Sequence, residues 1–153
     1  MSMQISQVIF AAVLCLASVG ARGAENAATR LRQARSLQCT YQSSEGTWVR
    51  SGHRTIEEDP DHGTAIYDNI DVTRGSARII ANAGAADLTA WMDRQGSLWL
   101  IERTPLGYEV VTTVYPMYAD GSTDGFVVLE SRHTFAGSIA VASTAYGTCR
   151  VKQ

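Results

Sequence analysis

From Leu37 onward, hydrophobic and polar side chains alternate with a period of two residues. Leu37, Cys39 and Tyr41 alternate with polar neighbours, and the stretches 108–115 and 125–133 repeat this alternation in β-branched and aromatic residues. A period of two places successive side chains on opposite faces of a β-strand, whereas an amphipathic helix needs a period near 3.6. The pattern therefore predicts an all-β domain.

Short connections ending in glycine separate many of these stretches, as at Thr73–Gly75, Arg94–Gly96 and Thr104–Gly107. Connections of this length form hairpins and cannot make parallel crossovers, so consecutive strands should pair antiparallel as a meander. Two longer connections, 51–63 and 116–125, are predicted to be loops. The predicted strands span residues 37–43, 46–50, 65–72, 76–82, 86–93, 97–103, 108–115, 125–133 and 138–147.

A meander of about eight or nine strands has exposed edges unless it closes, and closure makes its first and last strands neighbours. Cys39 lies on the first predicted strand and Cys149 two residues beyond the end of the last, 149 − 39 = 110 positions apart. Closure would bring them within disulfide distance, so we predict a Cys39–Cys149 disulfide. We predict a closed or nearly closed antiparallel barrel over 37–153, with a two-sheet β-sandwich as the alternative.

The N-terminus predicts export. Residues 8–19 form an apolar run of 12 residues, followed by small residues up to Gly23. Such a run is shorter than the roughly 20 residues of a membrane-spanning helix and fits the core of a signal peptide, which we place at 1–23. Cys15 would leave with it, so two of the three cysteines remain and pair most economically in an oxidising compartment. We expect an extracytoplasmic protein, periplasmic or secreted, with no transmembrane span after signal removal.

The remaining chain reads as a single domain behind a short lead-in. Residues 24–36 carry Arg30, Arg32 and Arg35 among small and polar residues and are expected to form a flexible or one-turn helical lead-in, solvated rather than bound to an anionic surface. The formal net charge of −2 is spread along the sequence, with no basic cluster suited to nucleic acid. Nucleic acid is therefore not an expected partner, and the oligomeric state is not predicted.

Candidate catalytic groups are present without a catalytic arrangement. Ser131 and His133 share one face of a predicted strand, but no nucleophile elbow, orienting carboxylate or oxyanion hole accompanies them. Arg132 shares the opposite face with Glu130, which indicates an ion pair at the surface or at a barrel mouth. No catalytic residues are predicted, and the sequence favours a protein that is not an enzyme.

Two segments contain metal-ligand side chains. The segment His53–Gly63 holds His53, His62 and four carboxylates, which are ligand types for zinc or manganese. Asp120–Gly125 matches the opening of a calcium loop, although serine occupies its twelfth place and no helices flank it. A solvated loop and a hairpin turn account for the same residues, so no metal and no cofactor are predicted.

The stretches Trp99–Gly107, Val111–Val114, Ser131–His133 and Tyr146–Cys149 resemble a family of small exported bacterial proteins of unassigned function. This resemblance implies one secreted β domain and no particular activity. The disulfide between first and last strands is also similar to that of small periplasmic lysozyme-inhibitor barrels, whose short Ser-Gly-containing inhibitory loop has no counterpart located in this sequence.

Aromatic side chains are numerous enough to line a barrel. A barrel of about eight strands is either filled by side chains or holds one small ligand. We therefore predict a non-enzymatic extracytoplasmic binding module for a small apolar ligand or an envelope component. The alternative is a protein-interaction or inhibitor module acting through 51–63 and 116–125. The aromatic candidates are Trp48, Tyr67, Trp91, Trp99, Tyr108, Tyr115, Tyr118 and Phe126, and the candidate cavity residues are Trp99, Ile101, Val110, Val114 and Phe126.

Overall fold

The computed structural model describes residues 27–58, 63–82, 84–104 and 107–152, so the predicted signal peptide lies outside the described residues. A short helix at 27–33 precedes nine antiparallel strands. Among the described residues, no helix combines the length and apolar character needed to cross a membrane. The strands are β1 (Leu37–Arg50), β2 (His53–Glu58), β3 (Thr64–Asp71), β4 (Ser76–Ala81), β5 (Gly84–Met92), β6 (Leu98–Arg103), β7 (Glu109–Tyr118), β8 (Phe126–Ala136) and β9 (Ile139–Val151).

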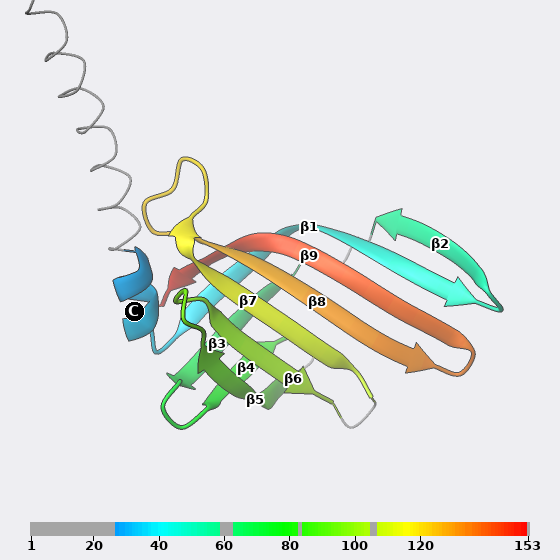
Figure 1. Cartoon of the computed structure of the whole chain (residues 1–153), viewed down its shortest axis with the longest axis horizontal. Helices are drawn as coiled ribbons and strands as arrows, with labels where there is room; N and C mark the ends of the chain where they lie inside the picture. Colours follow the sequence, from blue (N-terminus) through cyan, green and yellow to red (C-terminus); the bar gives the residue numbers. More distant parts are fainter. Residues whose placement is uncertain (1–26, 59–62, 83, 105–106, 153) are drawn as a thin grey trace, which may run out of the picture.

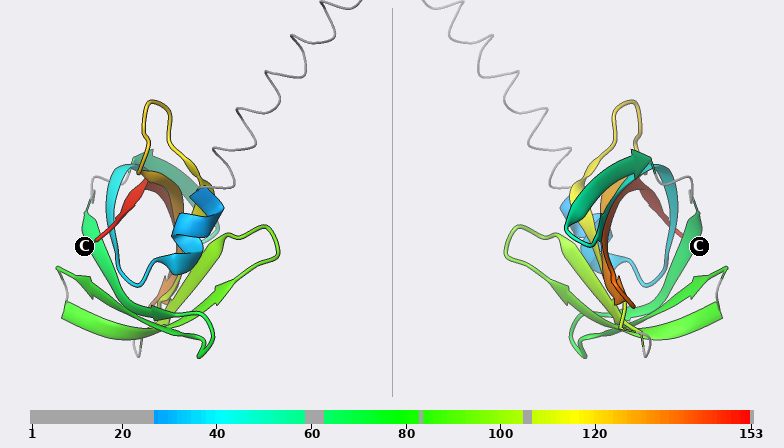
Figure 2. Two further views of the ribbon diagram at one scale, coloured as in Figure 1. Left: turned by 90° about the vertical axis from the view of Figure 1, so that its left-hand side faces the viewer. Right: turned by 90° about the vertical axis from the view of Figure 1, so that its right-hand side faces the viewer.

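Eight of the strands close into a barrel, seen along its axis in Figure 2. Strands β3 to β9 follow one another as a meander, and β9 pairs back onto β1. The predicted all-β barrel is confirmed, and its closure excludes the sandwich. Cys39 lies directly opposite Cys149 in the closing strand pair, and a disulfide joins them. The covalent link thus joins the two ends of the barrel sequence where the sheet closes.

Three details of the strand prediction are wrong. Strand β1 is continuous over 14 residues and carries a bulge between Tyr41 and Ser43 where two strands were expected. Strand β2 lies inside the predicted loop 51–63, and β7 runs on to Tyr118 inside the predicted loop 116–125. All six residues of β2 are exposed, so burial imposes no apolar alternation on that strand and the pattern could not reveal it.

Strands β1, β8 and β9 are longer than the barrel, and β2 pairs with the projecting part of β1 (Figure 1). β3 pairs with β1 only over 37–40, and β7 reaches β8 only as far as His133. Beyond these limits, β2, β1, β9 and β8 continue as a projecting sheet that we call the ribbon, made of residues 45–50, 53–58, 133–136 and 139–144. One face of the ribbon continues the barrel interior, and the other continues its outside.

Apolar side chains fill the end of the barrel opposite the ribbon. The helix lies across this end (Figure 2). Leu31 of the helix is 1% exposed. Arg30 donates a hydrogen bond to the Tyr118 hydroxyl at 3.0 Å, and Arg35 donates one to the Ile70 carbonyl at 2.9 Å. Residues 27–33 therefore form the helical alternative of the expected flexible or one-turn helical lead-in, and they pack against the barrel as a cap. The fully buried side chains beneath it include Leu37, Tyr67, Leu98, Leu100, Val114, Phe126, Val128 and the disulfide.

Candidate functional site

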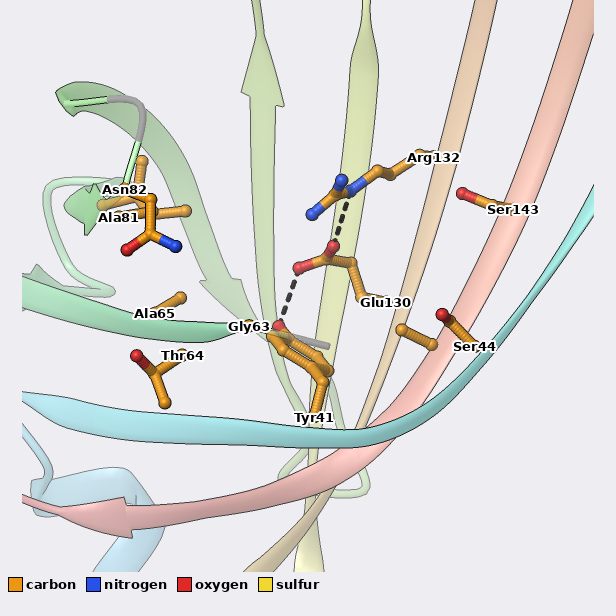
Figure 3. Close-up of a pocket in the computed structure, with 12 residues that line it drawn as sticks. Tyr41, Ser44, Gly63, Thr64, Ala65, Ala81, Asn82, Glu130, Arg132 and Ser143 are labelled. Carbon is orange, nitrogen blue, oxygen red and sulfur yellow. Dashed lines mark hydrogen bonds and ion pairs between the residues drawn. The ribbon is translucent and has the colours of Figure 1, made fainter. Parts of the chain in front are cut away.

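A pocket of about 190 Å³ opens at the barrel mouth, on the side of the ribbon (Figure 3). Strands β1, β3, β4, β8 and β9 contribute to it, so it exists only because the barrel closes. Most of the side chains around it are hydroxyl-bearing, amide or small. Its lining comprises Tyr41, Ser44, Gly63, Thr64, Ala65, Ile79, Ala81, Asn82, Glu130, Arg132, Ser143 and Ala145.

Glu130 anchors the floor of this pocket. The alternation of β8 turns it inward together with Phe126 and Val128, and it is only 3% exposed. Its Oε2 accepts hydrogen bonds from the hydroxyls of Tyr41 at 2.7 Å and of Tyr67 at 3.3 Å. The hydroxyl of Thr112 donates to the same oxygen at 3.3 Å. Four strands thus supply one buried hydrogen-bond network.

Arg132 completes the network from the mouth side. Its Nε donates to Glu130 Oε1 at 2.8 Å, while its side chain stays 50% exposed (Figure 3). A buried carboxylate needs a paired charge and satisfied hydrogen bonds, and Glu130 has both. The predicted Glu130–Arg132 ion pair is therefore present, and it lies at the barrel mouth rather than on the outer surface.

Burial fixes the protonation of the groups around Glu130. Desolvation, followed by the charge of their neighbours, raises the pKa of the Tyr41 and Tyr67 hydroxyls, so both remain donors at neutral pH. Glu102 also faces the interior, because its β6 position lies opposite Val110, which in turn lies opposite Arg132. Burial first, and the negative charge of Glu130 second, raise the pKa of Glu102, while Arg132 opposes the rise.

The inner face of the ribbon extends the site beyond the mouth. The six-membered ring of Trp48 lies over Gly46, in the space that a side chain at position 46 would occupy. Thr134 lies on the same face, opposite Val141, and its Oγ1 is buried without a hydrogen-bond partner in the part of the chain that the structure describes. A shallow groove here is lined by Trp48, Arg50, Ser51, His53, Thr55, Glu57 and Ile139.

The predicted apolar cavity residues do not line the pocket. Trp99 and Ile101 face outward, because Leu98 and Leu100 occupy the inward positions of β6, so their prediction as cavity residues is wrong. Val114 and Phe126 face inward but belong to the filled core under the helix. The polar floor was missed instead: Tyr41, Tyr67 and Thr112 meet Glu130 only through the register of separate strands, and no local motif marks them.

Ser131 and His133 lie on the outside of β8, and no hydrogen bond joins these two described side chains. No cluster of three or more His, Cys, Asp and Glu side chains able to hold a metal occurs among the described residues, while His62 lies outside them. In the segment Asp120–Gly125, the Ser122 hydroxyl accepts the Gly125 amide at 2.7 Å and so closes the turn. This geometry gives the segment a structural role as a hairpin loop.

Large apolar side chains gather on the outer surface of the sheet rather than on loops. Trp91, Trp99, Leu129 and Tyr146 lie in one row on strands β5, β6, β8 and β9, with the buried Thr113 of β7 between Trp99 and Leu129. The rings of Trp91 and Trp99 stack with their centroids 5.7 Å apart. Leu129 is 41% exposed and Tyr146 38%. We call this set the outer apolar row.

A scan against models of protein families finds no matching family, and a search of curated proteins finds no match. Function must therefore be argued from the geometry of the barrel mouth, the ribbon and the outer apolar row.

Proposed function

We propose that the protein is a non-enzymatic extracytoplasmic binding module whose barrel mouth takes a small, uncharged ligand rich in hydroxyl or amide groups, such as one unit of an envelope saccharide. The observation that carries the proposal is the polar pocket in which Glu130 and Arg132 neutralise each other at 2.8 Å. The disulfide supports an oxidising, extracytoplasmic compartment, as does the expected signal peptide.

The pairing of the charges determines the class of ligand. The lining contains one carboxylate and one guanidinium, and the two already bind each other, so a charged ligand would have to compete with an existing ion pair. The hydroxyls of Ser44, Thr64 and Ser143 and the amide of Asn82 suit hydrogen bonds with neutral groups instead. Of the two ligands expected from the sequence, a small apolar molecule or an envelope component, this chemistry favours the second.

The size of the pocket and the position of the groove suggest how a longer molecule would lie. At about 190 Å³ the pocket is smaller than the roughly 300–1,000 Å³ typical of drug-sized ligands, so it accommodates one small unit. The groove beside Trp48 is a separate hollow farther along the inner face of the ribbon, and it shares no lining residue with the pocket. An aromatic ring flanked by Arg50, Thr55 and Glu57 suits the apolar face and hydroxyl rim of a second sugar ring. No step of this binding requires bond making or breaking.

Titration with the disaccharide of N-acetylglucosamine tests this proposal, with dodecanoate as the apolar comparison. Amide NMR shifts should appear at the mouth and along the ribbon for the sugar. Asn82→Ala and Ser143→Ala should each weaken binding by about 2–10-fold, the effect of one neutral hydrogen bond. Ser138→Ala, in the exposed turn between β8 and β9, is the matched control. Shifts at the mouth with dodecanoate alone, or no shift with the sugar at millimolar concentration, would contradict the proposal.

The outer apolar row supports a second candidate, the interaction module. Its exposed side chains lie on strands, so the proposed interaction surface moves from the predicted loops 51–63 and 116–125 to the outer sheet face. Exposed contiguous apolar surface is a common mark of protein contact sites. Native mass spectrometry of protein purified from its own envelope would show a partner mass that disappears in Leu129→Ser/Tyr146→Ser. An unchanged complex in that variant would contradict this candidate.

A further inference from the structure

Strand β2 has one unpaired edge. It pairs with β1 on one side, and no described strand pairs with it on the other. Unpaired strand edges present a row of N–H and C=O groups that readily accept another strand. Charged side chains usually protect such edges by repelling a second copy, so the arrangement of charges decides what the edge of β2 can accept.

The turn before β2 determines which backbone groups face outward. Ser51 and Gly52 have φ of 50° and 80°, which defines a two-residue type I′ hairpin. In such a turn the N–H of His53 bonds to the Arg50 carbonyl, so His53 faces β1. Alternation then directs the N–H and C=O of Arg54, Ile56 and Glu58 to the free edge.

The same three residues carry a self-complementary pattern on the outer face of the sheet. An antiparallel copy related by a two-fold axis at Ile56 would place Arg54 opposite the partner's Glu58 and Ile56 opposite the partner's Ile56. This register keeps opposed side chains on one face, and it pairs all three outward-facing residues. A register centred on Thr55 would oppose Arg54 to isoleucine and leave the acidic end opposite the turn.

The isolated chain leaves these charges without compensation. Glu58 lies directly opposite Glu45 of β1, a like-charge pair that is unfavourable across strands. Neither Arg54 nor Glu58 forms an ion pair with any residue that the structure describes. The partner's Arg54 would lie on the other side of Glu58 from Glu45 and offset this repulsion.

We propose that two copies of the protein associate through β2, antiparallel and centred on Ile56, so that their ribbons form one continuous sheet. The contact is isologous, because each copy contributes the same Arg54, Ile56 and Glu58 pattern. It involves neither the barrel mouth nor the outer apolar row, so it stands independently of the proposed function. An edge contact of this size is expected to be concentration-dependent.

Sedimentation analysis of the protein produced from its full sequence tests the pairing between about 1 μM and 1 mM, the range of weak association. The wild type should change from monomer to dimer across it. Glu58→Arg would oppose the partner's Arg54 and should weaken the dimer about tenfold or more. The double variant Arg54→Glu/Glu58→Arg should restore it, because the pair is then reversed rather than broken. Arg78→Glu, an exposed charge on β4, is the matched control.

A second variant tests the backbone contact. Ile56→Pro removes the N–H that faces the free edge and leaves the hydrogen bonds to β1 in place, so it should abolish the dimer while circular dichroism stays native. A wild type that remains monomeric at the highest concentration overturns the proposal. So does a dimer that withstands Glu58→Arg and Ile56→Pro, or one lost instead with Leu129→Ser/Tyr146→Ser.

Discussion

Replacing Glu130 with glutamine keeps the side-chain volume and removes the buried charge on which the pocket floor is built. The two short hydrogen bonds of Glu130, from Tyr41 at 2.7 Å and from Arg132 at 2.8 Å, are charge-assisted. Bonds of this kind contribute about 1.5–3 kcal/mol each, against about 1 kcal/mol for a neutral bond. With its oxygen toward Tyr41, the amide accepts one neutral bond, and its NH₂ then faces the Arg132 guanidinium, which only donates, so the bond to Arg132 is lost.

Water offsets part of this loss, since the Arg132 side chain is half exposed and can be rehydrated. We expect Glu130→Gln to lower the free energy of unfolding by about 2–3 kcal/mol. Urea unfolding with the disulfide intact measures it, and the melting temperature should fall by about 10 °C for a domain of this size. Losing Arg132 as well, in Glu130→Gln/Arg132→Met, should cost less than the sum of the single changes. A loss below about 0.5 kcal/mol for Glu130→Gln would refute the reasoning, because neutral surface changes cause as much.

Three further predictions concern closure, packing and pH. Cys39→Ala/Cys149→Ala should lower the free energy of unfolding by about 3–4 kcal/mol. Thiol labelling of the denatured wild type should detect neither cysteine before reduction. Labelling without reductant would contradict the disulfide. Gly147→Ala should lower the free energy of unfolding in urea by about 2–3 kcal/mol, because the new Cβ would lie 2.8 Å from a backbone Cα of β1. Gly63→Ala is the control and should be neutral, because a Cβ there would meet nothing within 4 Å. Equal effects of the two changes would contradict the packing argument. Because the pKa of Glu102 is raised in the folded protein, its contribution to stability is present below its unfolded pKa of about 4.3 and is lost as pH rises through the folded value. Glu102→Gln should therefore stabilise the protein at pH 7 and not at pH 3. A variant less stable than the wild type at pH 7 would contradict this sign.

The barrel could be predicted because its determinants are local or repeat along the chain. Period-two alternation gave the strands, and glycines gave the turns: Gly75, Gly96 and Gly107 all have positive φ in the structure. The terminal positions of Cys39 and Cys149 then indicated closure. Strand β2 escaped prediction because it packs on neither face, and the packing of the lead-in helix on the barrel escaped because its buried residues, among them Leu31, are few and widely spaced.

The pocket floor could not be predicted for a different reason. Alternation placed Glu130 and Arg132 on one face of β8, but the opposite face, with Leu129, looked just as suitable for the core. Only the register with β1, β3 and β7 shows that the charged face turns inward, where Tyr41, Tyr67 and Thr112 satisfy the carboxylate. Register depends on every strand at once, so no single segment of sequence reveals it.

The two ends of the barrel divide stability from the proposed binding. The end under the helix contains the disulfide and the fully buried apolar side chains, so it supplies the dry core and the covalent constraint. That stability allows the other end to hold an ion pair and hydroxyls whose burial would otherwise be unfavourable. The long strands β1, β8 and β9 then extend past the mouth, and their inner face places Trp48 beside the polar pocket. A barrel of uniform strand length would have the same core and no such wall, which makes the ribbon the part of this chain most directly tied to the proposed binding at the mouth.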